Sequence, residues 1–169
     1  MFIQTTYPEQ FGFGFEGQLA DSGSDRFIRI YTNSVADMSF GRAVVQLPAD
    51  ADNECSIPSA ASQGLLGITT FTHAWERDLL SDSGDAGIAQ NKPANVLRRG
   101  RVIVVVESAV TPASPVYYRH SNAGASPEAI ARFRGDNDGG SGDVEQVTSG
   151  ARFMTSASAG EKAILEISL

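Results

Sequence analysis

The run Val102-Ile103-Val104-Val105-Val106 is the strongest structural signal in the sequence. All five residues are β-branched, and such side chains favour extended backbone because they pack well on a pleated surface. An uninterrupted apolar run of this kind is typical of a strand that is covered on both faces. The surrounding segment, residues 95–110, is therefore expected to form a buried strand.

Shorter segments of the same character lie on either side of this run. They occupy residues 26–32, 43–47, 65–72, 115–120, 144–156 and 163–169. In the last of them, Leu165, Ile167 and Leu169 share one face of a strand, while Ile164 and Glu166 share the other. Short strands separated by Gly- and Pro-rich stretches predict an all-β fold, a jelly-roll-like sandwich or barrel. The best helical signal, at Ser126-Pro127, supports one or two turns, and residues 131–134 are equally compatible with a strand.

Length and charge restrict the class of protein. The chain has 169 residues, with 20 acidic and 13 basic side chains and a formal net charge of −7. This length suits one domain, or one domain with an arm. The acidic balance argues against a nucleic-acid partner, because duplex-binding proteins present a basic face. No apolar run approaches the length of a membrane-spanning helix, and no secretory signal is visible. No membrane partner is therefore expected.

The first nineteen residues differ from the rest of the chain. They contain Phe2, Tyr7, Phe11, Phe13 and Phe15, interleaved with glycines. Glycine is costly to order, so this segment has little reason to fold alone. Two interpretations remain open: the rings dock on a separate chain, or the segment is a first strand on the chain's own core. The pattern favours docking, and we expect an extended arm at residues 1–22 followed by a β-domain at residues 23–169.

Motifs that would carry chemistry are weak. Residues 12–17 match G-x-G-x-x-G, but no preceding strand or following helix is expected, so no dinucleotide cofactor is predicted. Residues 136–143 are rich in Asp but lack the ligand pattern of an EF-hand, and a solvated loop is favoured over a metal site. His73 and His120 have no recognisable nucleophile elbow, and Cys55 lies in an acidic turn that raises its thiol pKa. No enzyme activity, metal or cofactor is expected.

Two further clusters have competing interpretations. Arg98, Arg99 and Arg101 surround Gly100, which suggests a tight basic turn. Such a turn either pairs with carboxylates on a neighbouring chain or is a solvated hairpin tip, and both readings stay open. The aromatic residues Trp75, Tyr117 and Tyr118 either pack in the core or an interface, which is favoured, or form a sugar-stacking platform.

The order of the strand-forming segments resembles a known family. The run Asn95-Val96-Leu97-Arg98-Arg99-Gly100-Arg101-Val102, followed by Pro115-Val116-Tyr117-Tyr118-Arg119, is similar to the cement, or decoration, proteins of tailed-bacteriophage capsids. The resemblance covers residues 41–169. The family has Gly-Asp before the position of Pro115, where this sequence has Ala113-Ser114.

The resemblance implies a structural virion protein on the capsid exterior that binds the major capsid protein and bridges capsomers. It implies no catalytic residue and no cofactor. We expect Phe11, Phe13, Phe15, Arg98, Arg99 and Arg101 to form contacts with the capsid or a neighbouring subunit. A homodimer is favoured, with a trimer as the second possibility. The competing function is a carbohydrate-binding β-sandwich, which requires Trp75, Tyr117 or Tyr118 to be exposed in one concave patch.

Overall fold

The computed structural model describes residues 14–20, 25–35, 38–72, 87–121 and 130–169. Within these residues the regular structure is twelve strands and one short 3-10 turn, so the expected all-β class is confirmed. The elements are β1 (Phe27–Asn33), β2 (Met38–Ser39), β3 (Ala43–Val45), β4 (Glu54–Cys55), β5 (Leu65–Thr69), β6 (Gly87–Ile88), β7 (Pro93–Val105), β8 (Tyr117–Arg119), β9 (Phe133–Arg134), η3 (Asp138–Gly140), β10 (Val144–Gln146), β11 (Ala151–Phe153) and β12 (Lys162–Ser168).

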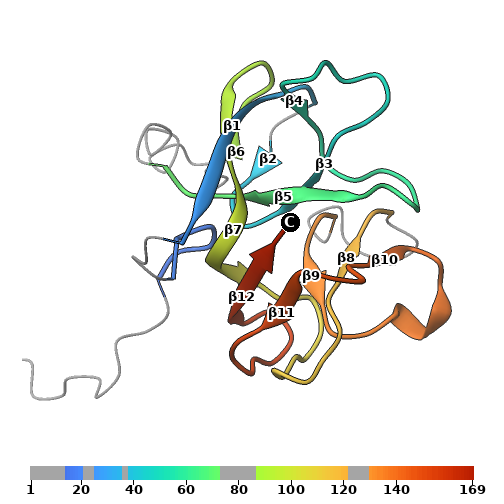
Figure 1. The fold of residues 1–169 in the computed structure, drawn as a ribbon. Helices are drawn as coiled ribbons and strands as arrows, with labels where there is room; N and C mark the ends of the chain where they lie inside the picture. Colours follow the sequence, from blue (N-terminus) through green and yellow to red (C-terminus); the bar gives the residue numbers. More distant parts are fainter. Residues whose placement is uncertain (1–13, 21–24, 36–37, 73–86, 122–129) are drawn as a thin grey trace, which may run out of the picture.

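Strand β7 organises the main sheet, as its β-branched run predicts. Its first half pairs antiparallel with β1, and its second half pairs antiparallel with β12. The order β11-β12-β7-β1-β4 is joined by β5, which pairs with both β7 and β3. Figure 1 shows this strongly bent, barrel-like sheet, with β7 in yellow-green running through its middle. Two smaller sheets, β10-β8-β9 and β2-β6, complete the fold.

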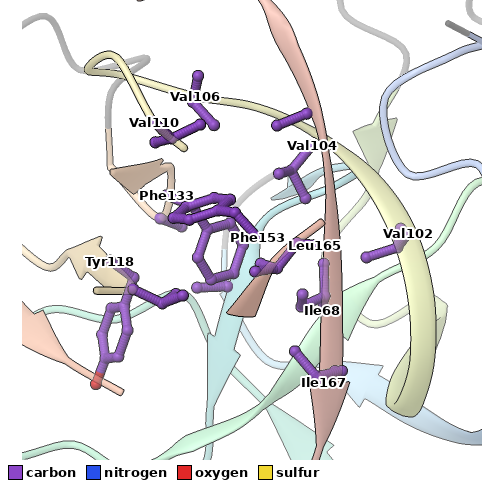
Figure 2. Close-up of a cluster of buried hydrophobic side chains, with 14 of the residues drawn as sticks. Ile68, Val102, Val104, Val106, Val110, Tyr118, Phe133, Phe153, Leu165 and Ile167 are labelled. Carbon is purple, nitrogen blue, oxygen red and sulfur yellow. The ribbon is translucent and has the colours of Figure 1, made fainter. Parts of the chain in front are cut away.

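The larger hydrophobic core lies beneath β7 and β12. Val102, Val104 and Val106 are fully buried, and alternate residues of β12, Leu165 and Ile167, pack in the same cluster. Figure 2 shows these side chains converging with Phe133 and Phe153 from neighbouring strands. Ile103, on the opposite face of β7, is also buried, so the expectation of a strand covered on both faces is confirmed. The predicted division of the last strand into two faces agrees with the burial of β12, since Leu165 and Ile167 are buried and Ile164 and Glu166 are half-buried, although Leu169 is exposed.

The segment just before β1 packs on the chain's own sheet. Leu19 forms an antiparallel bridge with Val102, and the backbone nitrogens of Gly17 and Ala20 donate to Ile103 and Arg101 at 2.8 and 3.0 Å. Residues 14–20 therefore agree with the second interpretation of this segment, in which it packs on the chain's own core. Residues 1–13 and the predicted boundary at residues 22–23 lie outside the described residues.

The predicted basic turn is wrong, because Arg98, Arg99 and Arg101 lie inside β7. Gly100 has a φ of +129°, a value that suits glycine, but the chain does not reverse there. The ladder continues instead, since Gly100 pairs with Ile167 and Arg99 pairs with Ser168. Residues 131–134 were equally compatible with a strand, and two of them, Phe133 and Arg134, form β9. Residues 126–129, where the weak helical signal begins, lie outside the described residues.

Candidate functional site

Phe15 is the described member of the predicted aromatic contact set. Its side chain is 68% exposed, although its ring stacks on Phe71 with a centroid separation of 5.9 Å. Phe11 and Phe13 lie outside the described residues. An exposed phenylalanine leaves a large apolar surface in water, which is the property expected of a contact residue. Its contact with a neighbouring chain stays a prediction.

The root of the arm is fixed to the domain by polar contacts. Lys162 donates from Nζ to the Gly14 carbonyl at 2.7 Å, and Glu16 lies 3.6 Å from the Arg42 guanidinium. Burial raises the pKa of Glu16, and the positive charge of Arg42 opposes that rise. The Gly17 carbonyl accepts a bond from the Phe71 backbone nitrogen at 2.8 Å. Any segment N-terminal to Gly14 therefore starts from a fixed point on the sheet.

The three predicted arginines have different surroundings within the chain. Arg99 pairs with Asp25 at 3.0 Å on the surface, and Arg101 pairs with Glu166 at 3.2 Å. Burial alone would raise the pKa of Glu166, but Arg152 and Arg101 together lower it. Nε of Arg98 is buried and has no hydrogen-bond partner. The carboxylates that Arg99 and Arg101 meet in this structure belong to the same chain, and their role at an interface stays a prediction.

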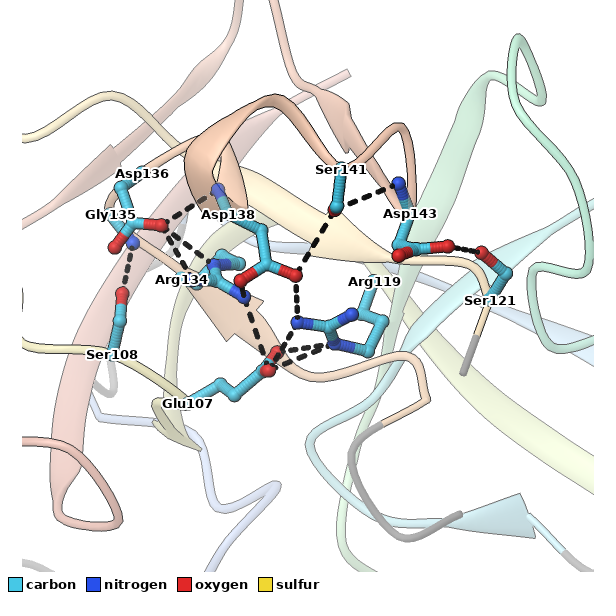
Figure 3. Close-up of polar contacts among 10 residues, drawn as sticks. All are labelled: Glu107, Ser108, Arg119, Ser121, Arg134, Gly135, Asp136, Asp138, Ser141 and Asp143. Carbon is cyan, nitrogen blue, oxygen red and sulfur yellow. Dashed lines mark hydrogen bonds and ion pairs between the residues drawn. The ribbon is translucent and has the colours of Figure 1, made fainter. Parts of the chain in front are cut away.

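A dense ion-pair network fills the space between the main sheet and the sheet of β8, β9 and β10. Arg119, only 2% exposed, donates from Nε to both Glu107 oxygens at 2.8 and 2.9 Å, and from Nη2 to Asp138 at 2.7 Å. Arg134 contacts Glu107, Asp136 and Asp138 at 3.1, 2.5 and 2.9 Å. Figure 3 shows the two guanidinium groups between the three carboxylates. The network joins the ends of β7, β8 and β9 to η3.

This network accounts for Asp136 and Asp138 of the Asp-rich loop at residues 136–143, whereas Asp143 accepts a hydrogen bond from Ser121. The hydrogen bond donated by Arg119 is the largest influence on Asp138 and lowers its pKa, and the hydrogen bonds that Arg119 donates to Glu107 raise the pKa of Arg119. Burial would raise the pKa of Asp136, but hydrogen bonds and Arg134 lower it overall. Asp136 and Asp138 thus neutralise part of the charge of Arg119 and Arg134. Among the described residues no group of three or more His, Cys, Asp or Glu side chains could hold a metal ion.

The residues weighed for catalysis do not form an active site within the described part of the chain. Both ring nitrogens of His120 are buried without a hydrogen-bond partner, so no base and nucleophile converge there. Cys55 is buried in β4, and burial, assisted by Asp50, raises its thiol pKa to about 12. The sequence also predicted a raised thiol pKa for Cys55, but the main cause is burial rather than the acidic turn. His73 lies outside the described residues.

Of the aromatic residues that the carbohydrate alternative names, Tyr118 is not available for sugar stacking in the described part of the chain. Tyr118 is 1% exposed, and its hydroxyl donates to the Gln63 carbonyl. Tyr117 precedes it in β8 and so points to the opposite face of the strand. Trp75 lies outside the described residues. The preferred interpretation, packing rather than sugar stacking, holds for Tyr118.

An exposed apolar surface on β1 was missed by the sequence analysis. Phe27, Ile28 and Ile30 are 52%, 36% and 64% exposed, whereas Tyr31 of the same strand is buried. The alternation of residues 26–32 shows that Ile28 and Ile30 share a face. Nothing in the alternation shows that residues 27–30 are exposed on both faces of the strand, whereas Tyr31 is buried.

Two comparisons with known proteins give a family and a shared fold. The family model described as structural cement protein (E217 gp24/Pam3 gp6) matches residues 3–168. A chain from a solved structure of the capsid of Myoviridae Phage XM1 has a similar fold, with a TM-score of 0.68 and 15% sequence identity. The alignment covers 99% of this chain and 98% of that one. No curated protein matches the sequence. Within the described residues, no helix is long and apolar enough to cross a membrane.

Proposed function

Because the chain belongs to the phage structural cement protein family, whose members are structural components of the virion, we propose that it binds the exterior of the capsid shell and bridges neighbouring capsomers. Its direct partner in this proposal is the major capsid protein. The observation that carries the proposal is the family match over residues 3–168. The absence of a convergent catalytic cluster among the described residues is consistent with a role based on adhesion.

The N-terminal arm supplies part of the contact area. Its root, residues 14–20, is held by Lys162, Arg42 and β7, so the aromatic residues before it are presented from a fixed position. Phe15 already exposes most of its ring. Burying such a side chain contributes about 1.5–3 kcal/mol, so Phe11, Phe13 and Phe15 together can support a specific contact.

Association between copies strengthens this function. A two-fold homodimer lets one unit reach two capsomers, and linked weak contacts raise the overall affinity through effective concentration. A trimer would act in the same way at a three-fold position. Arg99 is exposed enough to exchange Asp25 for a carboxylate of a neighbouring chain, and Arg98 and Arg101 belong to the same proposed contact. Binding only to the assembled shell stabilises that shell by linkage.

Deletion of residues 1–13 tests the arm while leaving its clamped root in place. We expect the deleted protein to keep its melting temperature but to lose occupancy on shells that lack the cement protein. Phe15→Ser should reduce occupancy, whereas Leu169→Ser, at another exposed apolar residue, should leave it unchanged. Full occupancy by the deleted protein would refute the role of the arm.

Charge reversal tests the proposed arginine contact. We expect Arg99→Glu to lower the melting temperature of decorated capsids, because it removes the exposed cation of the set. Arg152→Glu is the matched control, since Arg152 is an exposed arginine of the same sheet outside the proposed contact. Equal effects of the two changes would contradict the proposal.

A further inference from the structure

The N-terminal part of β1 exposes an apolar strand. Phe27, Ile28 and Ile30 are all exposed, and Ile28 and Ile30 project from the same face. Figure 1 shows β1, in blue, at the outside of the main sheet beside β7. Soluble proteins usually shorten or charge an exposed strand, since its backbone groups can pair with another chain. Three large apolar side chains on one such strand therefore indicate a contact.

In the part of the chain that the structure describes, the outer edge of β1 from Ile28 to Ile30 has no neighbouring strand. β1 pairs with β7 from Phe27 to Thr32, whereas β4 pairs only with Thr32 and Asn33. The Thr32 nitrogen donates outward to Asn53 at 2.8 Å, while the Asn33 nitrogen donates to Lys92 at the start of β7 at 2.9 Å. Backbone groups alternate in direction along a strand. Those of Ile28 and Ile30 therefore point outward, and within the described residues no strand pairs with them.

The charges beside this edge distinguish the possible occupants. Arg26 and Arg29 are exposed, and residues 26–31 contain no carboxylate. If a second copy paired antiparallel with Ile28 opposite Ile30, the two Arg29 residues would lie opposite each other, and like charges on paired strands are destabilising. A strand carrying carboxylates would meet them with opposite charge. The arrangement disfavours self-pairing and favours an acidic partner.

We propose that the outer edge of β1 receives an extended segment of the major capsid protein, with apolar residues at alternate positions and carboxylates beside them. This inference rests on the proposed function and specifies its recognition mode. Main-chain hydrogen bonds to Ile28 and Ile30 provide the pairing, and their side chains provide apolar contact. Arg26 and Arg29 select the acidic segment.

Two kinds of substitution test the edge without disturbing the core. Ile30→Pro removes an outward N–H but no bond to β7, and proline is tolerated on edge strands. Ile28→Thr with Ile30→Thr retains β-branched side chains while removing apolar surface. Ile30→Val is the matched control. Each full-length variant is mixed with shells that lack the cement protein, and bound copies per shell, the melting temperature of the free protein and its mass in solution are measured.

We expect occupancy at a fixed subsaturating concentration to fall at least tenfold for the proline and double-threonine variants, with the valine variant unchanged. Arg26→Glu with Arg29→Glu should reduce occupancy without altering the mass in solution. The inference alone would be overturned if the double-threonine variant occupied shells as fully as the wild-type protein. It would also be overturned if the edge variants lost self-association in solution but bound the capsid unchanged. Failure of the wild-type protein to bind shells would overturn the proposed function and the inference together.

Discussion

Replacing Arg119 with methionine is expected to remove the central cation of the network between the two main parts of the fold. Methionine keeps an unbranched stem but cannot pair with Glu107 or Asp138. Breaking a buried ion pair by removing one partner costs about 3–5 kcal/mol, because the remaining charge stays uncompensated. Arg119 is 2% exposed, so the full range applies. For a chain of this size that loss corresponds to a melting temperature lower by about 6–20 °C.

Urea and thermal unfolding of the free protein measure this loss. Arg152→Met is the control, because Arg152 is 64% exposed and its pair with Glu166 should contribute less than about 1 kcal/mol. The double change of Arg119→Met with Glu107→Gln should cost less than the sum of the two single changes. A loss of less than about 1 kcal/mol for Arg119→Met would refute the reasoning that the network is desolvated and essential.

The pH dependence provides a second measurement of the same network. Arg119 lowers the pKa of Asp138 below its ordinary value of 3.8, so the stabilisation is fully present above that value. It is lost as the pH falls through the lower pKa of the folded state. The stability difference between wild type and Arg119→Met should be constant between about pH 5 and 8 and shrink below about pH 4. If this stability difference grew as the pH fell, the predicted direction of the pH dependence would be wrong.

Two further predictions concern the root of the arm and the buried thiol. Gly17→Ala should lower the free energy of unfolding by roughly 2–4 kcal/mol, because Gly17 has a φ of +80° and a new Cβ would lie 2.7 Å from the Phe40 Cβ. Gly160→Ala, at the same φ but with open space around it, should cost only about 1–2 kcal/mol, and equal losses in thermal melts would contradict a clash. Cys55, whose burial raises its pKa to about 12, should react with a maleimide at pH 8 only as fast as the protein unfolds. Rapid labelling of the native protein, followed by mass spectrometry, would show that the thiol is not enclosed.

Local sequence was sufficient to locate the main strands. The segments at residues 26–32, 65–72 and 163–169 correspond to β1, β5 and β12, with ends that differ by at most three residues. Period-two alternation and β-branched content are properties of a few adjacent residues, so they can be read without a partner. The two-residue strands β2, β4 and β6 were not predicted, because such short pieces are defined by the chain that pairs with them.

The misplaced basic turn shows the limit of local signals. Gly100 between arginines is typical of a turn, yet β12 continues its pairing through Gly100 and Arg99. The hydrogen bonds offered by a neighbouring strand outweigh the turn preference of one glycine. The Asp-rich loop is a similar case, since Asp138 meets Arg119 and Arg134 because the pairing of β8 with β9 brings these two arginines together.

The sequence by itself determined the all-β class, the buried strand at Val102–Val106 and the absence of a recognisable catalytic motif, because each depends on side-chain chemistry or short-range periodicity. Only the tertiary structure decided which part of β1 stays in solvent, where the root of the arm is held and which carboxylates pair with Arg119. These features depend on contacts between residues far apart in the chain, and no local pattern specifies which distant segment will supply the partner.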